Sequence, residues 1–207
     1  MSCVTDPTSR PGSARPQVLA SGIVRLIAIM LLGSGVLTGN CRTAIAAPPG
    51  GPFALTDGDG RQVSDRDFRG RYMLIYFGFT FCPEACPTTL SAVADALDRL
   101  GAKADRIQPI FITLDPKRDT PAVMKQYAAA FDRRLIGLTG TTEQIDQVAE
   151  EYRVYHVENR TGPAPGDYSI DHSSVLYVMG PDGRFIVGIR GDASGAEIVE
   201  TLAELMS

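Results

Sequence analysis

Two cysteines in the middle of the chain have the spacing and surroundings of a functional thiol pair. Cys82 and Cys86 follow an apolar run, and Pro87 suits the start of a helix. Unsatisfied N–H groups at a helix N-terminus lower the pKa of a nearby thiol, so we expect Cys86, beside the N-cap, to favour the thiolate. The three residues between the cysteines leave room for a metal ion. The same pair could close a disulfide if its Cα atoms lie within about 7 Å.

The pair therefore indicates metal binding or thiol–disulfide exchange. The alternative is an inert structural disulfide with no functional role. Exported proteins often carry structural disulfides. A bridge across so short a loop removes little entropy from the unfolded chain, however, and would stabilise the fold weakly. A junction between a strand and a helix is also where α/β sheets place their sites, which favours chemistry.

The sequence has two histidines, and one of them is expected near the cysteines. His156 lies in an alternating, strand-like segment, and we expect it to be a surface or half-buried strand residue. His172 lies in a polar segment that we interpret as a loop directly before an apolar strand at 175–179. That loop should lie at the same end of the sheet as the cysteine loop.

Two thiolates and one neutral imidazole would form a soft, three-ligand metal site. Thiolates favour Cu(I), and the imidazole allows the same site to accept Cu(II). Zinc is the competing metal, but a structural zinc site normally has four protein ligands. A fourth ligand would have to be His156, a carboxylate or water, because the remaining cysteines, Cys3 and Cys41, precede the expected domain.

Alternating strand and helix patterns surround these residues. Nearly continuous apolar runs at 73–79 and 107–114 are typical of central buried strands, and the segments 53–63 and 175–189 predict β-hairpins. The short apolar segment 134–138 is interpreted as an edge strand. Helix starts are indicated by proline and capping patterns, near Pro87, Thr120, Thr141 and Ser194. In the helix after Thr120, the residues expected to face the core are Val123, Tyr127 and Phe131.

The order of these elements is typical of one fold class. A βαβ unit joined to a ββα unit predicts an α/β, thioredoxin-like fold with an N-terminal β-hairpin and a β-hairpin near the C-terminus. The domain is expected to span residues 53–207, after a linker at 48–52 that is rich in proline and glycine.

Residues 1–47 have the features of a signal sequence or an N-terminal membrane anchor. Arg10, Arg15 and Arg25 precede an apolar run at 26–37, and a small-x-small cleavage pattern follows at 44–46. The run is shorter than the roughly 18 apolar residues of a usual membrane span, although an anchor that starts earlier in the chain would be long enough. We therefore expect export, followed either by cleavage or by anchoring.

Length and composition limit the class of protein further. The chain has 207 residues, of which 44% are hydrophobic and 21% charged, which excludes a disordered tail, a collagen-like fibre and a polytopic membrane protein. Four of the 20 basic and one of the 24 acidic residues precede residue 47, so the net charge of −4 becomes −7 in the mature domain. So acidic a domain is not expected to bind nucleic acid.

Several motifs of the expected domain together resemble the Sco/SenC family of copper-binding, thioredoxin-like proteins. They appear in the family's order from about residue 53 to the C-terminus. The motifs are Tyr76-Phe77-Gly78-Phe79-Thr80, Cys82-Pro83, Cys86-Pro87, Leu114-Asp115-Pro116-Lys117-Arg118-Asp119-Thr120-Pro121, Tyr168, Asp171-His172-Ser173, Tyr177 and Pro181-Asp182-Gly183.

This resemblance implies a set of site residues and partners. By position, the family's copper ligands fall on Cys82, Cys86 and His172, and Asp115 is implied to support the site from outside the ligand set. Glu84 stands where the family more often has aspartate, which keeps the charge. The resemblance implies delivery of copper to, or reduction of thiols at, the dinuclear Cu-A site of cytochrome c oxidase. The partner would be the oxidase subunit that carries this site, and another copper chaperone or a thiol reductant would be further partners. It also implies a location in the periplasm or at the outer face of the inner membrane.

We therefore expect a copper metallochaperone, rather than a conventional enzyme, that binds Cu(I) and Cu(II) through Cys82, Cys86 and His172. The alternative is a thiol–disulfide oxidoreductase whose redox-active Cys82 and Cys86 reduce cysteines of a partner protein. Thioredoxins place a cis-proline before the strand that faces their cysteines, and the segment 171–174 has no proline, which weighs against general disulfide exchange. An oxidised cysteine pair cannot hold copper, so metal loading requires reduction first.

Overall fold

The computed structural model describes residues 47–207, and the predicted leader with Cys3 and Cys41 lies outside them. None of the helices formed by residues 47–207 is long and apolar enough to cross a membrane. The elements are β1 (Ala54–Asp57), β2 (Gln62–Ser64), η1 (Asp65–Phe68), β3 (Tyr72–Gly78), α1 (Ala85–Leu100), η2 (Gly101–Arg106), β4 (Ile107–Thr113), α2 (Pro121–Ala129), β5 (Ile136–Thr139), α3 (Thr142–Glu151), β6 (His156–Arg160), β7 (Tyr168–His172), β8 (Val175–Met179), β9 (Phe185–Arg190) and α4 (Gly195–Leu205).

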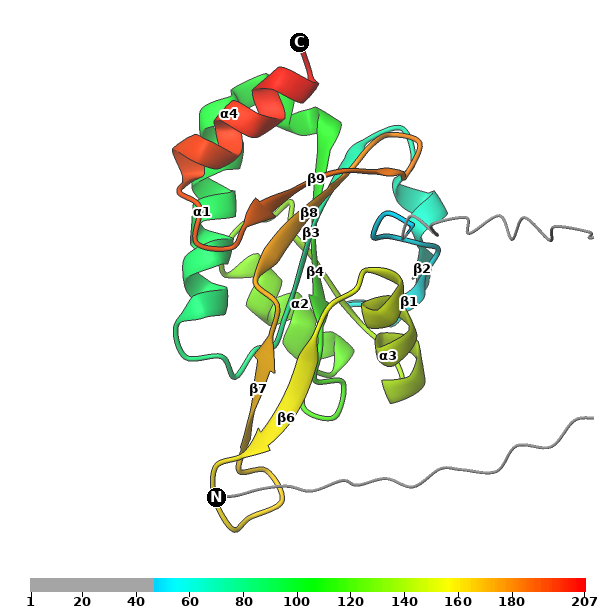
Figure 1. Cartoon of the computed structure of the whole chain (residues 1–207), viewed down its shortest axis with the longest axis vertical. Coiled ribbons are helices and arrows are strands. Elements are labelled where there is room, and N and C mark those ends of the chain that lie inside the picture. The colour runs from blue at the N-terminus through cyan, green and yellow to red at the C-terminus, as the bar shows by residue number, and fades with distance from the viewer. Residues whose placement is uncertain (1–46) are drawn as a thin grey trace, which may run out of the picture. The chain divides into compact units, whose positions relative to one another are not determined.

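A seven-stranded mixed sheet forms the centre of the fold (Figure 1). Its strands lie in the order β2-β1-β5-β4-β3-β8-β9. The central strands β3, β4 and β5 are parallel, and the flanking pairs are antiparallel. Both predicted hairpins, β1–β2 and β8–β9, are confirmed.

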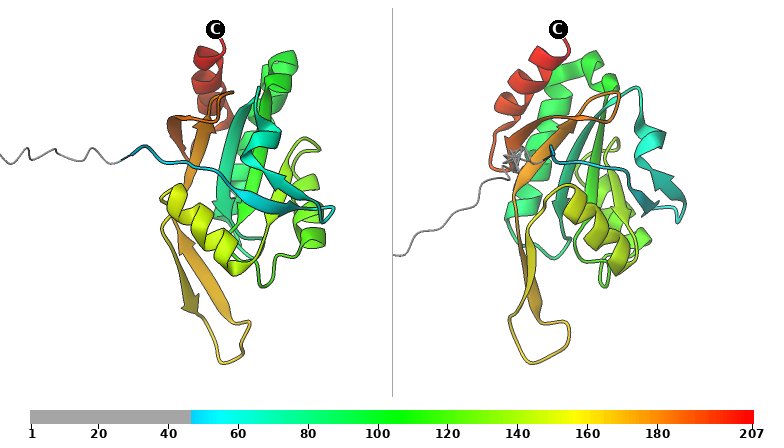
Figure 2. Two further views of the ribbon diagram at one scale, coloured as in Figure 1. Left: turned by 90° about the vertical axis from the view of Figure 1, so that its right-hand side faces the viewer. Right: turned by 45° about the vertical axis from the view of Figure 1, so that its right-hand side comes forward.

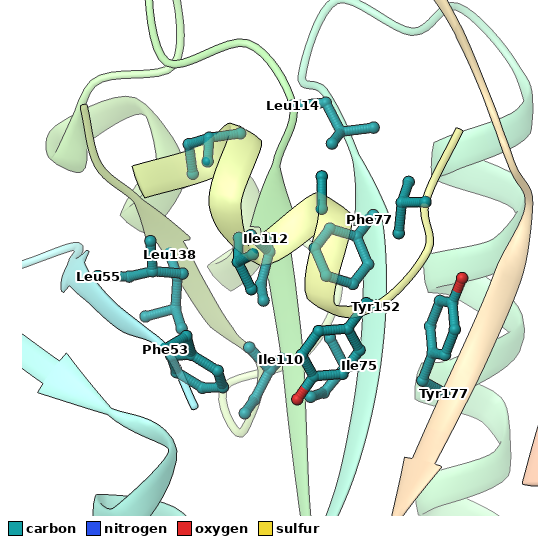
Figure 3. Close-up of a cluster of buried hydrophobic side chains, with 14 of the residues drawn as sticks. Phe53, Leu55, Ile75, Phe77, Ile110, Ile112, Leu114, Leu138, Tyr152 and Tyr177 are labelled. Atoms are coloured by element: carbon teal, nitrogen blue, oxygen red, sulfur yellow. The ribbon is translucent and has the colours of Figure 1, made fainter. Parts of the chain in front are cut away.

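Two apolar layers cover the faces of this sheet, because successive side chains of a strand point to opposite faces. Phe77 of β3 packs into the layer under α3, whereas its neighbour Tyr76 packs into the layer under α1, α2 and α4. Figure 3 shows part of the first layer, where Tyr177 meets Phe77 and Tyr152 edge-on. The buried run predicted at 73–79 is therefore a central strand with both faces covered.

The helix starts predicted from Thr120, Thr141 and Ser194 are confirmed by their capping contacts. Thr120 accepts a hydrogen bond from the backbone N–H of Val123, and Thr141 and Ser194 form reciprocal capping boxes. These local contacts fix the residue at which each helix begins.

The buried face of α2 differs from the prediction. Met124 and Ala128 are buried, whereas the predicted Val123 is only half-buried. The helix lies so close to β5 that a Cβ atom at Gly137 would be 2.6 Å from the Met124 carbonyl oxygen. The predicted Tyr127 and Phe131 are half-buried and pack against the same apolar layer, with the Tyr127 ring 5.5 Å from that of Phe111.

The interpretation of 134–138 as an edge strand is wrong. The strand that forms there, β5, lies between β1 and β4, antiparallel to the former and parallel to the latter. The N-terminal hairpin folds back against its outer side, so that β2 and β9 are the outermost strands. Where a hairpin attaches depends on contacts between distant segments, which a local pattern does not contain.

The chain between α3 and β8 forms a second sheet of two strands, β6 and β7, which projects beyond one end of the main sheet (Figures 1 and 2). The prediction of a loop at His172 is wrong, because His172 is the last residue of β7 and pairs with His156 at the start of β6. Most side chains of this hairpin are exposed or half-buried, so the sequence indicated only the strand around His156 and not its partner β7.

Truncation of a central core residue should lower the stability of the domain. Ile112 in β4 is fully buried, so Ile112→Ala leaves a cavity, and we expect the free energy of unfolding to fall by about 2–5 kcal/mol. Ile186 in β9 keeps 40% of its surface exposed, and Ile186→Ala is the control, with an expected loss of about 1 kcal/mol or less. Urea denaturation measures both variants, and equal losses would contradict this core.

Candidate metal centre

The cysteine pair lies where β3 passes into α1, as predicted. The chain leaves β3 at Gly78 and turns, with the Cys82 N–H donating to the Phe79 carbonyl at 3.3 Å, before α1 begins at Ala85. Cys86 is in the first turn of the helix, and its N–H donates to Cys82 Sγ at 3.4 Å. Both cysteines are free thiols. The amide at the helix N-terminus is thus directed at the Cys82 sulfur.

Cys86 is fully buried in the layer between the sheet and α1. Burial raises the pKa of its thiol to about 12, because a thiolate would lose its hydration among apolar side chains. The expectation that the helix N-terminus would favour the thiolate at Cys86 is therefore wrong. The N–H that could stabilise a thiolate points at Cys82, and desolvation dominates at Cys86. Cys86 keeps its proton at neutral pH unless a cation displaces it from the sulfur.

Gly78 leaves the space that the Cys86 sulfur occupies. A Cβ atom at position 78 would lie 2.6 Å from Cys86 Sγ and 3.0 Å from the Phe111 ring. Both distances are shorter than ordinary van der Waals contact. The glycine is required here because α1 packs directly against the end of β3.

His172 lies beside Cys86, although 86 positions separate the two residues in the chain. Its Nε2 is 3.7 Å from Cys86 Sγ, and its Nδ1 is 3.0 Å from the carbonyl oxygen of Ser173. A carbonyl oxygen has no proton to give, so Nδ1 carries the hydrogen and donates it. The lone pair of Nε2 then faces the sulfur. The rings of Tyr76 and Phe79 meet the imidazole edge-on and hold its plane.

Burial also sets the charge of the imidazole. Desolvation lowers the pKa of His172 below its usual value, so the ring is neutral at pH 7. A neutral imidazole is the form that binds metal ions. The prediction that His172 reaches the cysteine loop is borne out by its contact with Cys86, although it arrives there at the end of a strand.

The separation of these two atoms suits a shared metal ion. With metal–sulfur and metal–nitrogen bonds of about 2.3 and about 2.0 Å, the two ligand atoms lie about 3.5 to 3.7 Å apart at angles of about 110 to 120°. The observed distance of 3.7 Å falls at the trigonal end of that range. The spacing of Cys86 Sγ and His172 Nε2 is therefore compatible with two ligands of one ion.

Cys82 stands apart from this pair on the preceding loop. Among residues 47–207, no three or more His, Cys, Asp or Glu side chains are already gathered in an arrangement that could hold a metal ion. Cys82 is partly exposed and lines a hollow of about 430 Å³ together with Glu84, Ser174 and Asp192. Its hydrogen bond from the Cys86 N–H keeps the sulfur at the N-terminus of α1.

A buried carboxylate ties the cysteine loop to the end of β4. Asp119 is fully buried and accepts hydrogen bonds from the Thr80 N–H at 3.0 Å, Thr80 Oγ1 at 2.5 Å and Thr113 Oγ1 at 2.6 Å. Desolvation raises the pKa of Asp119, and its hydrogen-bond donors oppose that rise. The loop is thus anchored two residues before Cys82.

Asp115, which the resemblance implied as a supporting residue, acts on two other side chains. Its buried carboxylate accepts a hydrogen bond from the Tyr168 hydroxyl at 2.7 Å and pairs with the Arg118 guanidinium. Desolvation, followed by this hydrogen bond, raises the pKa of Tyr168 to about 12. Tyr168 begins β7 and His172 ends it, so Asp115 supports the histidine strand from its far end.

His156 takes the place that the sequence predicted for it. It begins β6 directly opposite His172, its side chain is 27% exposed, and its Nε2 lies 3.4 Å from the Asp146 carboxylate. A half-buried strand histidine is therefore confirmed. Its Nε2 faces Asp146 rather than a cysteine sulfur.

Reasoning from the sequence missed the anchoring role of Asp119 and of its partners Thr80 and Thr113. The available signal was an aspartate directly before the helix cap Thr120, in a segment that also resembles the family motif. A carboxylate in that position is usually exposed, and its burial becomes visible only when β3 and β4 are placed side by side.

Comparison with known families and sequences places the chain among related proteins. The family model SCO1/SenC matches residues 42–207. The chain is similar to the mitochondrial SCO1 homolog of Homo sapiens, with 41% identity over 164 residues that cover 76% of this chain and 52% of the relative. It thus spans about half the length of the curated relatives it matches.

Solved structures share the fold. The structure of Bradyrhizobium japonicum ScoI with copper bound is 42% identical, has a TM-score of 0.70, and covers 75% of this chain and 98% of that chain. BsSco, described as a member of the Sco family of cytochrome c oxidase assembly proteins, is 24% identical with a TM-score of 0.60 and covers 76% of this chain and 92% of that chain. These likenesses confirm the predicted thioredoxin-like α/β fold.

The two thiols should react at different rates in the reduced, metal-free protein. Cys82 lines an open hollow, whereas Cys86 is fully buried and keeps its proton. Iodoacetamide should therefore modify Cys82 first, because the exposed thiolate is the reactive form. Peptide mass spectrometry of a labelling time course measures both rates, and earlier modification of Cys86 would contradict its burial.

An alanine at position 78 should displace the Cys86 sulfur. In Gly78→Ala, the new methyl group overlaps Cys86 Sγ, so we expect a stability loss of about 1–3 kcal/mol and faster labelling of Cys86. Gly166→Ala is the matched control, because a Cβ atom there meets nothing within 4 Å. Denaturation and the same labelling assay measure both variants. Wild-type behaviour of Gly78→Ala would refute the tight packing.

Proposed function

The chain belongs to the SCO1/SenC family, and from this premise we propose that it is a copper metallochaperone that assists assembly of the Cu-A site of cytochrome c oxidase. The contact between Cys86 Sγ and His172 Nε2 is the observation that carries this proposal. Thiolate sulfur and neutral imidazole together suit both Cu(I) and Cu(II). The presence of copper in the related ScoI structure supports copper over zinc.

In this proposal Cys82, Cys86 and His172 hold the ion. Only a thiolate binds the metal, so copper must displace the proton of Cys86 and take its place in the buried position. Cys82 completes the site from its loop, which is tethered by the Cys86 N–H and by Asp119. A disulfide between Cys82 and Cys86 would remove both sulfur ligands, so the pair must be reduced before loading.

We extend this proposal to the role of the N-terminal segment, the location of the protein and its partners. We infer that residues 1–47 act as a signal or an anchor, and that the linker 48–52 and the domain 53–207 lie in the periplasm or at the outer face of the inner membrane. There the domain would meet the oxidase subunit that carries the Cu-A site. A second copper chaperone or a thiol reductant would supply copper or electrons.

A thiol–disulfide oxidoreductase is the second candidate, and the unequal exposure of the cysteines favours it. The partly exposed Cys82 would attack a partner disulfide to form a mixed disulfide and release one partner thiol. The Cys86 thiolate would then attack Cys82 Sγ, which leaves an oxidised Cys82–Cys86 pair and a reduced partner. Burial of Cys86 and the raised pKa of its thiol disfavour that second step, so we place metal binding first.

Copper titration of the reduced chain tests the proposal. We expect one copper ion per chain and a thiolate-to-Cu(II) charge-transfer band. His172→Ala should weaken Cu(II) binding by at least about tenfold, equivalent to about 1.4 kcal/mol, because Cu(II) needs the imidazole more than Cu(I) does. Replacement of either Cys82 or Cys86 by serine should abolish tight binding of both ions.

His156→Ala is the matched control, because it removes the other histidine of the chain, which faces Asp146 instead of a sulfur. It should leave copper binding and the absorption band unchanged. The chaperone proposal fails if the reduced chain binds no copper but turns over a disulfide substrate.

A further inference from the structure

We propose that Arg118 is a positioning residue whose guanidinium holds the loop of Cys82 against the strand of His172, and so sets the geometry required for Cu(II). This inference rests on the proposed function, because it assumes that Cys82 and His172 share one metal ion. Arg118 touches neither the metal nor the reacting atoms in this proposal. It acts through the segments that carry the ligands.

Arg118 lies between two aromatic rings that belong to these two segments. Its guanidinium carbon is 4.5 Å from the centre of the Phe81 ring and 3.7 Å from the centre of the Tyr168 ring. Phe81 directly precedes Cys82, and Tyr168 begins the strand that ends at His172. One planar cation therefore contacts both parts of the candidate site.

Further contacts fix the guanidinium between the rings. Its Nε pairs with the buried carboxylate of Asp115, and its Nη1 donates to the carbonyl oxygens of Gly166 and Tyr168, each at 3.2 Å. The Tyr168 hydroxyl donates to the same Asp115 carboxylate at 2.7 Å. Asp115 lies two residues after β4, a central strand, so these contacts attach the guanidinium to the central part of the sheet.

Two otherwise unfavourable features are explained by this arrangement. Phe81 keeps 61% of its surface exposed, so burial contributes little to its position, and the contact with Arg118 is what orders its ring. Arg118 Nη2 is buried and finds no hydrogen-bond partner among the described residues. The guanidinium gives up that hydrogen bond while it stacks on both rings. A lysine has neither the planar face nor the fork of donors that these contacts use.

The expected effect falls on Cu(II) rather than Cu(I) because the three ligands come from two separate segments. Cys82 and Cys86 belong to one short loop–helix segment, so the two sulfurs keep their relation without β7. His172 comes from the separate sheet of β6 and β7. Two thiolates suffice for Cu(I), whereas Cu(II) also needs the imidazole. A looser connection between loop and strand should therefore impair Cu(II) binding and spare Cu(I) binding.

Arg118→Lys in the reduced full chain tests this inference. The lysine keeps the positive charge beside Asp115 but removes the stack and the hydrogen-bonding fork. We expect Cu(II) affinity to fall about 10- to 100-fold, the usual loss when a group supporting a metal ligand is changed, with Cu(I) affinity unchanged. The thiolate-to-Cu(II) absorption band should shift or weaken. Chelator competition in each oxidation state and visible spectra measure these effects.

A second variant and a matched control guard against damage to the fold. Phe81→Leu removes one ring at an exposed position and should give a smaller loss in the same direction. Phe81→Leu removes a contact that Arg118→Lys already breaks, namely that between Arg118 and the Phe81 ring. The double variant should therefore lose no more Cu(II) affinity than Arg118→Lys alone. Arg69→Lys is the control, since Arg69 also pairs with a buried carboxylate, Asp65, at 2.5 Å, but precedes the other end of β3. It should leave copper binding unchanged.

The outcomes separate this inference from the function on which it rests. Wild-type Cu(II) affinity and spectra in both Arg118→Lys and Phe81→Leu would overturn the positioning role and leave the proposed function intact. Equal losses of Cu(I) and Cu(II) affinity would overturn it as well, because they would reflect general damage. Failure of the wild-type chain to bind copper at all would instead refute the proposed function.

Discussion

The antiparallel pairing of β3 with β8 is the constraint on which the candidate site depends. β3 leads into the cysteine loop and α1, and β8 begins three residues after His172. Because Tyr76 lies opposite Leu176 in this pairing, the end of one strand and the beginning of the other meet at the same end of the sheet. A slip of one residue would turn the side chains of β8 to the opposite face. The 3.7 Å contact between Cys86 and His172 exists only in this register.

Burial drives both members of that contact toward their neutral forms. It raises the pKa of the Cys86 thiol and lowers the pKa of the His172 imidazole, in each case because the charged form would lose its hydration. The pair is therefore a neutral thiol beside a neutral imidazole rather than a thiolate–imidazolium ion pair. Such a pair is a weak nucleophile, yet a cation that replaces the thiol proton compensates the charge on the sulfur. The same desolvation thus disfavours nucleophilic thiol chemistry at Cys86, and a metal ion must displace the thiol proton to bind there.

Local patterns in the sequence predicted much of the fold and part of the site. The helix caps at Thr120, Thr141 and Ser194, both hairpins, and the cysteine pair at a strand–helix junction depend on neighbouring residues and were predictable. A strand around His156 was expected, but β7 was interpreted as a loop, because this segment is polar and only Ile170 in it is buried. The pKa of Cys86 was misjudged because the helix terminus is a local feature, whereas burial comes from distant strands. The stacking of Arg118 on Tyr168 could not be predicted either, because it joins segments 50 positions apart.

The three candidate ligands differ in how firmly the fold holds them, and this difference bears on how a metal could leave. Cys86 is fixed by the close packing of α1 on Gly78, and His172 is fixed by its bond to Ser173 and by two flanking rings. Cys82 and His172 are both partly exposed, and Cys82 lies on a loop that borders an open hollow. In the proposed site, an incoming sulfur ligand would approach through that hollow, so exchange would begin at Cys82 while the buried Cys86 still holds the metal. On the proposed function, copper would therefore leave by stepwise exchange of ligands that starts at the thiol bordering the hollow.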